Sequence, residues 1–410
     1  MKKQIFLMSS LLIALTMVII IAGCSKEDKT EFKVTSIMAG TIDLNGATAP
    51  TNVPPDPTIT ATFSLGVDAA SVNNNSITLI RSYDAKQIAL TLTVAGSVIT
   101  IVPDENLGNG TLYTLGFTSA IMSTDGQGLS AFTRTFTTEG TFVPNGMVAY
   151  WSFENTAAEV LGNFDLVPGG VIDIAYASSY SAAAGQAAKF NGATTLIETA
   201  KGDSLMLTKD FTLAFWVMAD STKHGQFVMG LAGWYGFQFE ITGNYSWCKL
   251  AAQYTTGAST NSQDLYFPGD GKTKDNGGWK GFTFCKDLTG SGGVKYLLAN
   301  KWAHIVCRFI SDTKIATMYI NGEKMFEQDY NLYDPPMTLA DGLKYNGNPG
   351  NTNFVFGFIQ DKNDPTILDD WAKYDNPANG HFKGLLDNVR IYHKALTEQE
   401  IQLMYDSEKP

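Results

Sequence analysis

Short runs in which apolar and polar residues alternate restrict this chain more than any other feature of its sequence. In "TITATF" (58–63), for example, Ile59, Ala61 and Phe63 alternate with threonine. A period of two is that of a β-strand with one buried face. Long apolar stripes with a helical period are scarce, and 39 glycines supply turns. The sequence therefore predicts an all-β protein of packed sheets, with little helix.

Residues 1–24 have the pattern of an export signal. Lys2 and Lys3 precede an apolar stretch (5–21), and "IAGC" ends at Cys24. The "IAGC" stretch resembles a bacterial lipobox, which implies that Cys24 carries lipid; the alternative is a plain secretory signal with an incidental cysteine.

The five residues after Cys24, "SKEDK" (25–29), precede the first predicted domain. They resemble the export tag of lipoproteins displayed on Gram-negative cells that harvest glycans. This resemblance implies a protein anchored by lipid in the outer membrane and facing the cell exterior. A solvated tether (25–32) is the alternative.

The charge balance excludes some partners. Without Lys2 and Lys3 the chain has 27 basic and 40 acidic residues, a net charge of −13. Such a surface repels phosphate backbones and anionic headgroups. We expect no nucleic acid partner, and contact with the membrane through the lipid alone.

Besides Cys24, the chain has three cysteines, so one disulfide at most can form. Cys248 and Cys285 bracket a loop-rich stretch and are the candidate pair. Cys307 alternates in "HIVCRF" as a small buried residue does. Free buried thiols throughout are the alternative.

Residues 33–140 contain six short alternating runs separated by turns. The stretches "SLGVDAASVNNNSITLI", "ITIVPDENLGNGTLYTL" and "STDGQGLSAFTRTFTT" resemble a bacterial Ig-like domain. The resemblance implies a β-sandwich that serves as a spacer.

Residues 141–410 contain longer and more aromatic strands. The series is "MVAYWSFEN", "GQAAKFNGATTLIE", "DFTLAFWVMAD", "KWAHIVCRF", "ATMYINGEKM" and "GLLDNVRIYHKALTEQEIQLMY". It resembles a LamG-like, concanavalin A-like jelly roll, which implies that the first and last strands meet, with Trp151 and Asp387 close in space. Asn321-Gly322 predicts a tight hairpin, and "TEQEI" predicts a short C-terminal helix with Thr397 and Glu400 as a capping box.

Asp387 is an acid within the last predicted strand. It shares strand parity with Val389 and Ile391, so the alternation points it toward the core. The loop "FENTAAEVLGNFDL" (153–166) resembles the acidic loop of the LamG family. This implies a structural Ca²⁺ held by Glu159, Asn163 and Asp387. The alternative is that Asp387 accepts backbone N–H bonds.

We expect no enzyme activity from this chain. A retaining glycoside hydrolase on this fold would carry two alternating acids on one strand. "EQDYNL" (327–332) begins that way, but Leu332 replaces the last acid. No G-x-S-x-G motif occurs either.

Aromatic residues gather in two irregular stretches rich in Gly, Asn and Asp. The candidate carbohydrate-binding residues are Tyr245, Trp247, Tyr266 and Trp279 in the first stretch, and Trp371 and Tyr374 in the second. A sugar ring offers an apolar C–H face and a polar rim, which suit a flat aromatic ring beside amides and carboxylates. The alternative is that these insertions pack their own rings.

The sequence therefore predicts a surface lipoprotein whose LamG-like domain binds a glycan. An adhesin that engages a protein partner through the same loops is the alternative, because Tyr and Trp also dominate protein interfaces. A hydrolase or lyase is less favoured.

Overall fold

The computed structural model describes residues 30–222, 225–333, 340–376 and 380–410. The chain forms two compact units, Met1–Glu139 and Gly140–Pro410, each with its own hydrophobic core. Residues 1–29, with Cys24 and most of the tether, lie outside the described residues. In the part of the chain that is described, no helix is long and apolar enough to span a membrane.

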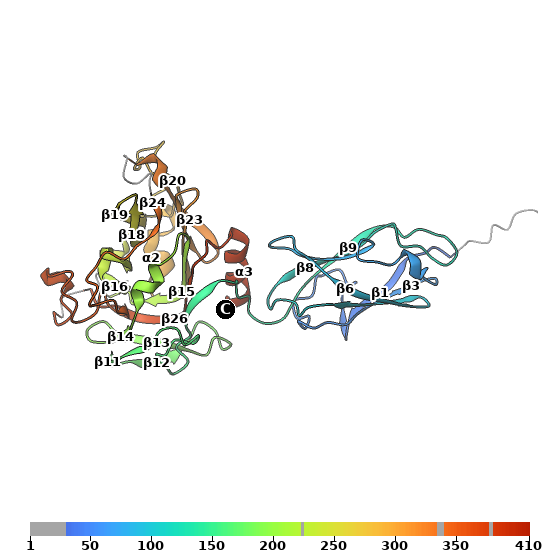
Figure 1. Cartoon of the computed structure of the whole chain (residues 1–410), viewed down its shortest axis with the longest axis horizontal. Coiled ribbons are helices and arrows are strands. Elements are labelled where there is room, and N and C mark those ends of the chain that lie inside the picture. The colour runs from blue at the N-terminus through green and yellow to red at the C-terminus, as the bar shows by residue number, and fades with distance from the viewer. Residues whose placement is uncertain (1–29, 223–224, 334–339, 377–379) are drawn as a thin grey trace, which may run out of the picture. The chain divides into compact units, whose positions relative to one another are not determined.

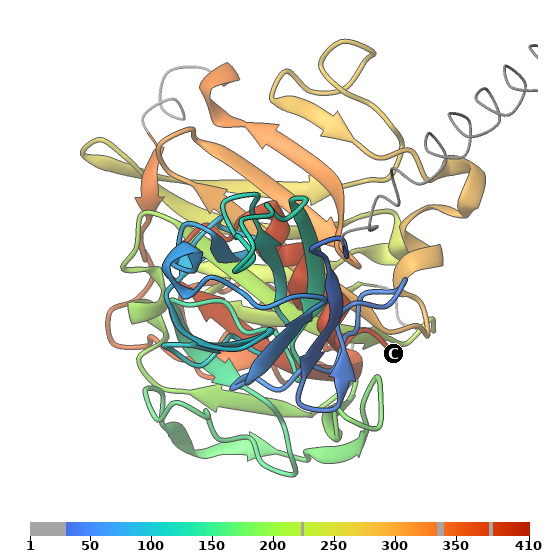
Figure 2. The ribbon, with the colours of Figure 1, turned by 90° about the vertical axis from the view of Figure 1, so that its right-hand side faces the viewer.

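The described part of the first unit consists of two antiparallel sheets, coloured blue to blue-green in Figure 2. One sheet has the order β2-β1-β3-β7-β6 and the other the order β5-β4-β8-β9. The strands are β1 (Val34–Ala39), β2 (Ile42–Asp43), β3 (Ile59–Phe63), β4 (Ile77–Arg81), β5 (Gln87–Ile88), β6 (Leu90–Ala95), β7 (Val98–Pro103), β8 (Leu112–Phe117) and β9 (Phe132–Thr137). One 3₁₀ turn, η1 (Ala69–Ser71), follows β3.

The predicted alternation builds the core of this unit. In β3, Ile59, Ala61 and Phe63 are buried, whereas the two threonines between them are half-buried. All six predicted strands are present. The structure adds β1, which pairs with β3 and was not predicted as a strand.

The described part of the second unit forms two larger sheets (Figure 1). The nine-stranded sheet has the order β12-β13-β26-β15-β21-β22-β23-β20, with β10 also paired to β26. Its strands are β10 (Met147–Trp151), β12 (Ala175–Ser178), β13 (Gln186–Asn191), β15 (Phe211–Ala219), β20 (Phe282–Cys285), β21 (Ala303–Ile310), β22 (Ile315–Ile320), β23 (Glu323–Asp329) and β26 (Lys383–Tyr392).

The eight-stranded sheet has the order β11-β14-β25-β16-β17-β18-β19, with β24 paired to β18. Its strands are β11 (Leu166–Ile172), β14 (Leu196–Thr199), β16 (Gln226–Leu231), β17 (Phe237–Ile241), β18 (Cys248–Thr256), β19 (Ser259–Phe267), β24 (Ala340–Leu343) and β25 (Phe354–Phe356). The main core lies between the two sheets and is rich in aromatic rings; Trp151, for example, packs against Phe354 and Phe356.

Strand β26 joins the beginning and the end of this unit, as predicted. Its first half pairs with β13 and its second half with β10, where Val389 lies opposite Trp151. Its other side pairs with β15 along most of its length.

Two strand predictions are wrong. The run 185–198, expected as one strand, is two strands, β13 and β14, that belong to different sheets. The stretch 243–299, expected to be irregular, contains the two nine-residue strands β18 and β19. In β18 polar and core residues alternate, with Lys249 and Gln253 between the core residues Cys248, Leu250, Ala252 and Tyr254, so a polar composition is compatible with a long strand.

The predicted hairpin and helix are both present. Asn321 and Gly322 have positive φ between β22 and β23. Helix α3 (Glu398–Glu408) begins at Thr397, which forms a capping box with Glu400. The other α-helix in the described residues, α2 (Gly293–Leu298), is a short turn.

A segment between β25 and β26, residues 357–376, covers part of the outer face of the eight-stranded sheet; we call it the cover segment. Phe358, Ile359 and Ile367 form a second cluster with Leu196 and Val355. Orange to red in Figure 1, the cover segment lies outside β16, on the side away from β15.

Candidate functional site

The eight-stranded sheet presents a row of side chains on its outer face, which begins beside the cover segment. Register pairs Phe227 on β16 with Glu240 on β17, Glu240 with Lys249 on β18, and Lys249 with Tyr266 on β19. Residues directly opposite one another share a face. The row spans three strand spacings, about 15 Å. We call it the sheet-face row.

Lys249 is the centre of this row. Its Nζ lies 2.9 Å from Asp264 Oδ2 and 3.5 Å from Glu240 Oε1. Gln238 donates to Glu240 Oε2 at 2.7 Å. Burial raises the pKa of Glu240, against the opposing effect of the Lys249 charge. The result is a fixed group of acceptors and donors at the middle of the face.

Tyr266 and its neighbour Trp247 form an aromatic group at the β19 end of the row. Trp247 precedes β18 and meets Tyr266 edge to face, with 5.6 Å between ring centroids. The Lys249 ammonium lies 5.1 Å from the Trp247 ring centroid, a cation–π distance. Both rings are half-buried, so part of each remains open to solvent.

A second aromatic group flanks the Phe227 end. Trp371, on the 3₁₀ turn η8 (Asp370–Ala372) of the cover segment, is 39% exposed. It stacks on Trp234 at 5.5 Å and 25°, and lies 6.0 Å from Phe227. Trp234 belongs to the 3₁₀ turn η3 (Gly233–Tyr235) between β16 and β17. The sheet-face row therefore has aromatic rings at both ends.

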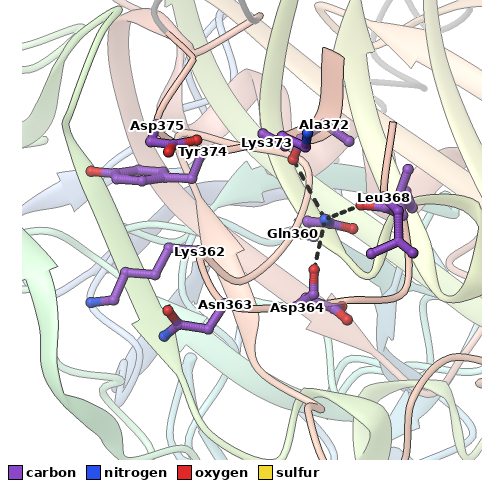
Figure 3. A pocket seen from close by; sticks show the side chains of 10 residues that line it. Gln360, Lys362, Asn363, Asp364, Leu368, Ala372, Lys373, Tyr374 and Asp375 are labelled. Carbon is purple, nitrogen blue, oxygen red and sulfur yellow. Dashed lines mark hydrogen bonds between the residues drawn. The ribbon is translucent and has the colours of Figure 1, made fainter. Parts of the chain in front are cut away.

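Tyr374 lies beside a hollow of about 360 Å³ within the cover segment (Figure 3). Its hydroxyl donates to the Thr194 carbonyl, which fixes the ring as a wall of the hollow. The floor is the buried Gln360, whose Nε2 donates to the carbonyl oxygens of Asp364 at 3.2 Å and Ile367 at 3.3 Å. Gln360 thus holds the segment in its folded shape.

Two predicted binding residues do not join this face. Tyr245 is buried in the main core, and its hydroxyl donates to the Asp220 carbonyl at 2.7 Å. Trp279 is 56% exposed, but its ring neighbour is Tyr333, at 6.5 Å, and not a residue of the sheet-face row.

The predicted calcium ligands are not assembled into a site. Glu159 accepts backbone N–H bonds from Tyr150 at 2.8 Å, Leu161 at 3.0 Å and Asn163 at 2.8 Å. Both carboxylate oxygens of Glu159 are therefore engaged in shaping its own loop. The Asn163 side chain donates to the Val148 carbonyl. In the described residues, no group of three or more His, Cys, Asp or Glu is arranged to hold a metal ion.

The predicted orientation of Asp387 is wrong. Leu386 and Val389 both point into the main core although three positions separate them, because the register shifts here and Asn388 has φ of 48°. This bulge turns Asp387 to the outer face of the nine-stranded sheet, opposite Trp216. There it is fully buried and accepts hydrogen bonds from the Ser179 hydroxyl and the Asn388 backbone N–H.

The predicted Cys248–Cys285 disulfide is absent, since both residues are free thiols. They belong to different sheets: Cys248 is on β18 with its sulfur facing Met318, and Cys285 is on β20 beside Asp270. Cys307 is buried, as predicted.

Sequence reasoning missed Trp234, Glu240 and Lys249. In "FQFEI" (237–241) Glu240 alternates with core residues, so its side chain points to the opposite face of the strand from theirs. In "CKLA" (248–251) Lys249 likewise lies between two core residues, Cys248 and Leu250. A period-two reading of these stretches would have found both residues. Trp234 sits in a turn, and no sequence signal relates it to Trp371.

The fold and the site describe a two-unit all-β protein with an aromatic-flanked sheet face. Residues 28–138 match the bacterial Ig-like domain, and residues 191–402 match the concanavalin A-like lectin/glucanases superfamily. The second match covers more than half of the chain, and the chain belongs to that superfamily. Both predicted domain types are thereby confirmed.

Several solved structures are similar to part of this chain at low sequence identity. The binding domain of Paraclostridial Mosquitocidal Protein 1 is 16% identical, with a TM-score of 0.41, over 64% of this chain and 52% of that one. Domain 4 of AbnA, a GH43 extracellular arabinanase from Geobacillus stearothermophilus solved with arabinotriose, is 20% identical, with a TM-score of 0.36, over 63% and 98%.

The ligand-binding domain of botulinum neurotoxin serotype D, solved with N-acetylneuraminic acid, is 13% identical, with a TM-score of 0.41, over 64% and 51%. This chain covers about half the length of the mosquitocidal and neurotoxin domains. A search of curated proteins found no significant match.

Proposed function

We propose that the second unit binds a carbohydrate chain on the outer face of its eight-stranded sheet. The observation that carries the proposal is the sheet-face row, whose polar centre is Glu240 and Lys249, with Asp264 paired to Lys249. Aromatic rings stand at both ends of the row: Trp371 beside Phe227 and Trp247 beside Tyr266. Hydroxyls of a sugar can bond to the polar centre while ring C–H faces lie on the tryptophans.

The width of the row suits a chain rather than a single sugar. Two aromatic groups about three strand spacings apart, roughly 15 Å, require a ligand that reaches both. The Trp371 ring already stacks on Trp234, and the Trp247 ring already packs against Tyr266. Little side-chain entropy is therefore lost when a ligand binds to these rings.

The ion pairs of the carboxylates on this face favour a binding protein over an enzyme. Glu240 and Asp264 are both paired with the same Lys249 ammonium group. A carboxylate fixed in an ion pair is poorly suited to transfer a proton to a glycosidic oxygen. We therefore propose a binding protein, not a hydrolase or lyase.

The rest of the proposal comes from the sequence. We propose that Cys24, in the lipobox-like stretch "IAGC", carries lipid, and that the following tag directs the protein to the outer membrane, facing the cell exterior. The Ig-like unit then serves as a spacer between the lipid and the carbohydrate-binding unit. In this proposal the protein contacts the membrane through the lipid alone and binds no nucleic acid, as its negative net charge leads us to expect.

Affinity electrophoresis against a panel of polysaccharides tests the binding face. We expect at least one polysaccharide to retard the protein, and Trp371→Ala and Trp247→Ala each to weaken that binding about tenfold, as for truncated hot-spot aromatics. Trp279→Ala is the matched control and should bind as the wild type does, because Trp279 is more exposed but lies away from the row.

Three outcomes would change the proposal. If no polysaccharide retards the folded protein, carbohydrate binding is wrong and a protein-binding adhesin becomes the better hypothesis. If only Trp279→Ala weakens binding, the site lies elsewhere. Release of sugar from a retained glycan would establish an enzyme.

A further inference from the structure

A polar hollow of about 380 Å³ shares Lys362 and Asn363 with the hollow of Gln360. It is bounded by β11, by Glu198 on β14, and by the chain segments on either side of β25. Its lining is dominated by oxygen-bearing side chains: Glu198, Asn348, Asn351, Asn353, Asp361 and Asn363. Nothing in the proposed function uses these residues.

Glu198 has an unsatisfied oxygen in this hollow. The side chain is 1% exposed, and Oε1 accepts the Lys362 backbone N–H at 3.0 Å. Oε2 has no hydrogen-bond partner in the described residues. The nearest positive charge, Lys362 Nζ, is 3.7 Å away and donates instead to the Gly169 carbonyl at 3.0 Å. A buried carboxylate oxygen without a hydrogen bond is costly and calls for a ligand.

Asp361 supplies a second buried carboxylate. It is 4% exposed, and its Oδ1 accepts the Asn363 backbone N–H at 2.7 Å. Its Oδ2 faces the side-chain amides of Asn353 and Asn351. Asp361 therefore directs one oxygen into a group of amides beside Glu198.

The Asn351 amide completes this group. Its nitrogen donates to Asp361 Oδ2 at 3.3 Å, and its oxygen accepts from the Asp364 backbone N–H at 3.0 Å. A hydrogen-bonded amide of this kind can turn over, which would bring its oxygen to Asp361 Oδ2.

The local charge also favours a cation. Glu198, Asp361 and Asp364 are each less than a tenth exposed, and Lys362 is the one basic side chain lining the hollow in the described residues. Burial raises the pKa of Glu198 and of Asp364, and the Asp361 charge adds to both effects. Two carboxylates and an amide oxygen are hard donors, and no imidazole or thiol lines the described hollow, which suits Ca²⁺ better than Zn²⁺.

We propose that this hollow binds a calcium ion through Glu198 Oε2 and Asp361 Oδ2, with the Lys362 ammonium group moving away from Glu198 and the Asn351 amide turning its oxygen Oδ1 toward the ion. The ion would tie the segment before β25 to the first residues of the cover segment. This differs from the calcium site that the family resemblance implied, because it uses neither Glu159 nor Asp387.

Calcium titration of chelator-treated full-length protein tests the site. We expect saturable heat in isothermal titration, with a Kd of about 10⁻⁴ M as in extracellular modules, and a rise of a few degrees in melting temperature. Glu198→Gln and Asp361→Asn should each weaken calcium binding at least tenfold. Lys362→Met should strengthen it several-fold, because a competing cation is removed.

Asp387→Asn is the matched control and should bind calcium as the wild type does. The proposal is overturned if millimolar Ca²⁺ produces neither heat nor a melting shift in wild type and Lys362→Met, or if Asp387→Asn alone abolishes binding. If Glu198→Gln or Asp361→Asn fails to fold, calcium titration of Lys362→Met still tests the site, because this variant should bind calcium more tightly than the wild type. Loss of glycan binding in the tryptophan variants has no bearing on this result, so the two proposals fail separately.

Discussion

Replacing Glu408 by glutamine is expected to lower the free energy of unfolding of the second unit by about 3–5 kcal/mol, the usual result of removing one partner of a buried ion pair. Glu408, the last residue of α3, pairs with Arg390 of β26, and the two side chains are only 2% and 5% exposed. Its other oxygen accepts Trp216 Nε1–H at 2.7 Å. The change leaves the Arg390 charge buried without its counter-ion.

Tryptophan fluorescence during urea unfolding measures this effect. All seven tryptophans lie between residues 151 and 371, so the signal reports the second unit alone. Glu398→Gln is the control: the same chemical change on the same helix, at an exposed residue bonded to the Tyr319 hydroxyl at 3.0 Å, should cost about 1 kcal/mol or less.

A double-mutant cycle separates the ion pair from the packing of α3. Arg390→Met removes the buried positive charge, so in that background Glu408→Gln should cost far less than it does alone. If Glu408→Gln costs the same with and without Arg390, the loss comes from the Trp216 bond or from helix packing, and the ion-pair argument is wrong.

How much of the fold the sequence predicts depends on how local each signal is. The alternation in β3, the Asn321-Gly322 hairpin and the Thr397–Glu400 capping box involve neighbours in the chain, and all three are confirmed. The division of 185–198 between two sheets depends on distant pairing partners, which a local pattern does not contain.

The candidate site shows the same limit. The local composition identifies Trp247 and Trp371 as aromatic residues in polar surroundings, but it identifies Tyr245 equally well. Tyr245 is buried, and its hydroxyl donates to the carbonyl of Asp220, a contact that the residues around Tyr245 do not reveal. A single bulge also explains why the predicted orientation of Asp387 is wrong. The bulge at Asn388 shifts the alternation of the strand by one residue and turns the Asp387 carboxylate away from the core.

Asp387 also makes the stability of the second unit depend on pH. Burial raises its pKa from 3.8 to about 8; the Glu154 charge adds to the rise, while the Ser179 and Asn388 hydrogen bonds and Arg390 oppose it. The folded state therefore keeps a proton that the unfolded state releases. This contribution to stability is fully present below about pH 4 and is lost as the pH rises through about 8, with a slope of at most about 1.4 kcal/mol per pH unit.

Asp387→Asn should remove most of this dependence. An asparagine reproduces the protonated acid: its oxygen can accept the Asn388 N–H, and its amide can donate to the Ser179 hydroxyl. Urea unfolding followed by tryptophan fluorescence should find the variant close to wild type at pH 5 and more stable by about 2–3 kcal/mol at pH 8.

A wild-type stability that stays level or rises between pH 5 and 8, or a variant that keeps the wild-type slope, would mean that Asp387 is ionised in the folded protein. Its carboxylate would then need a positive partner on the outer face of the nine-stranded sheet, where Arg390 is already committed to Glu408.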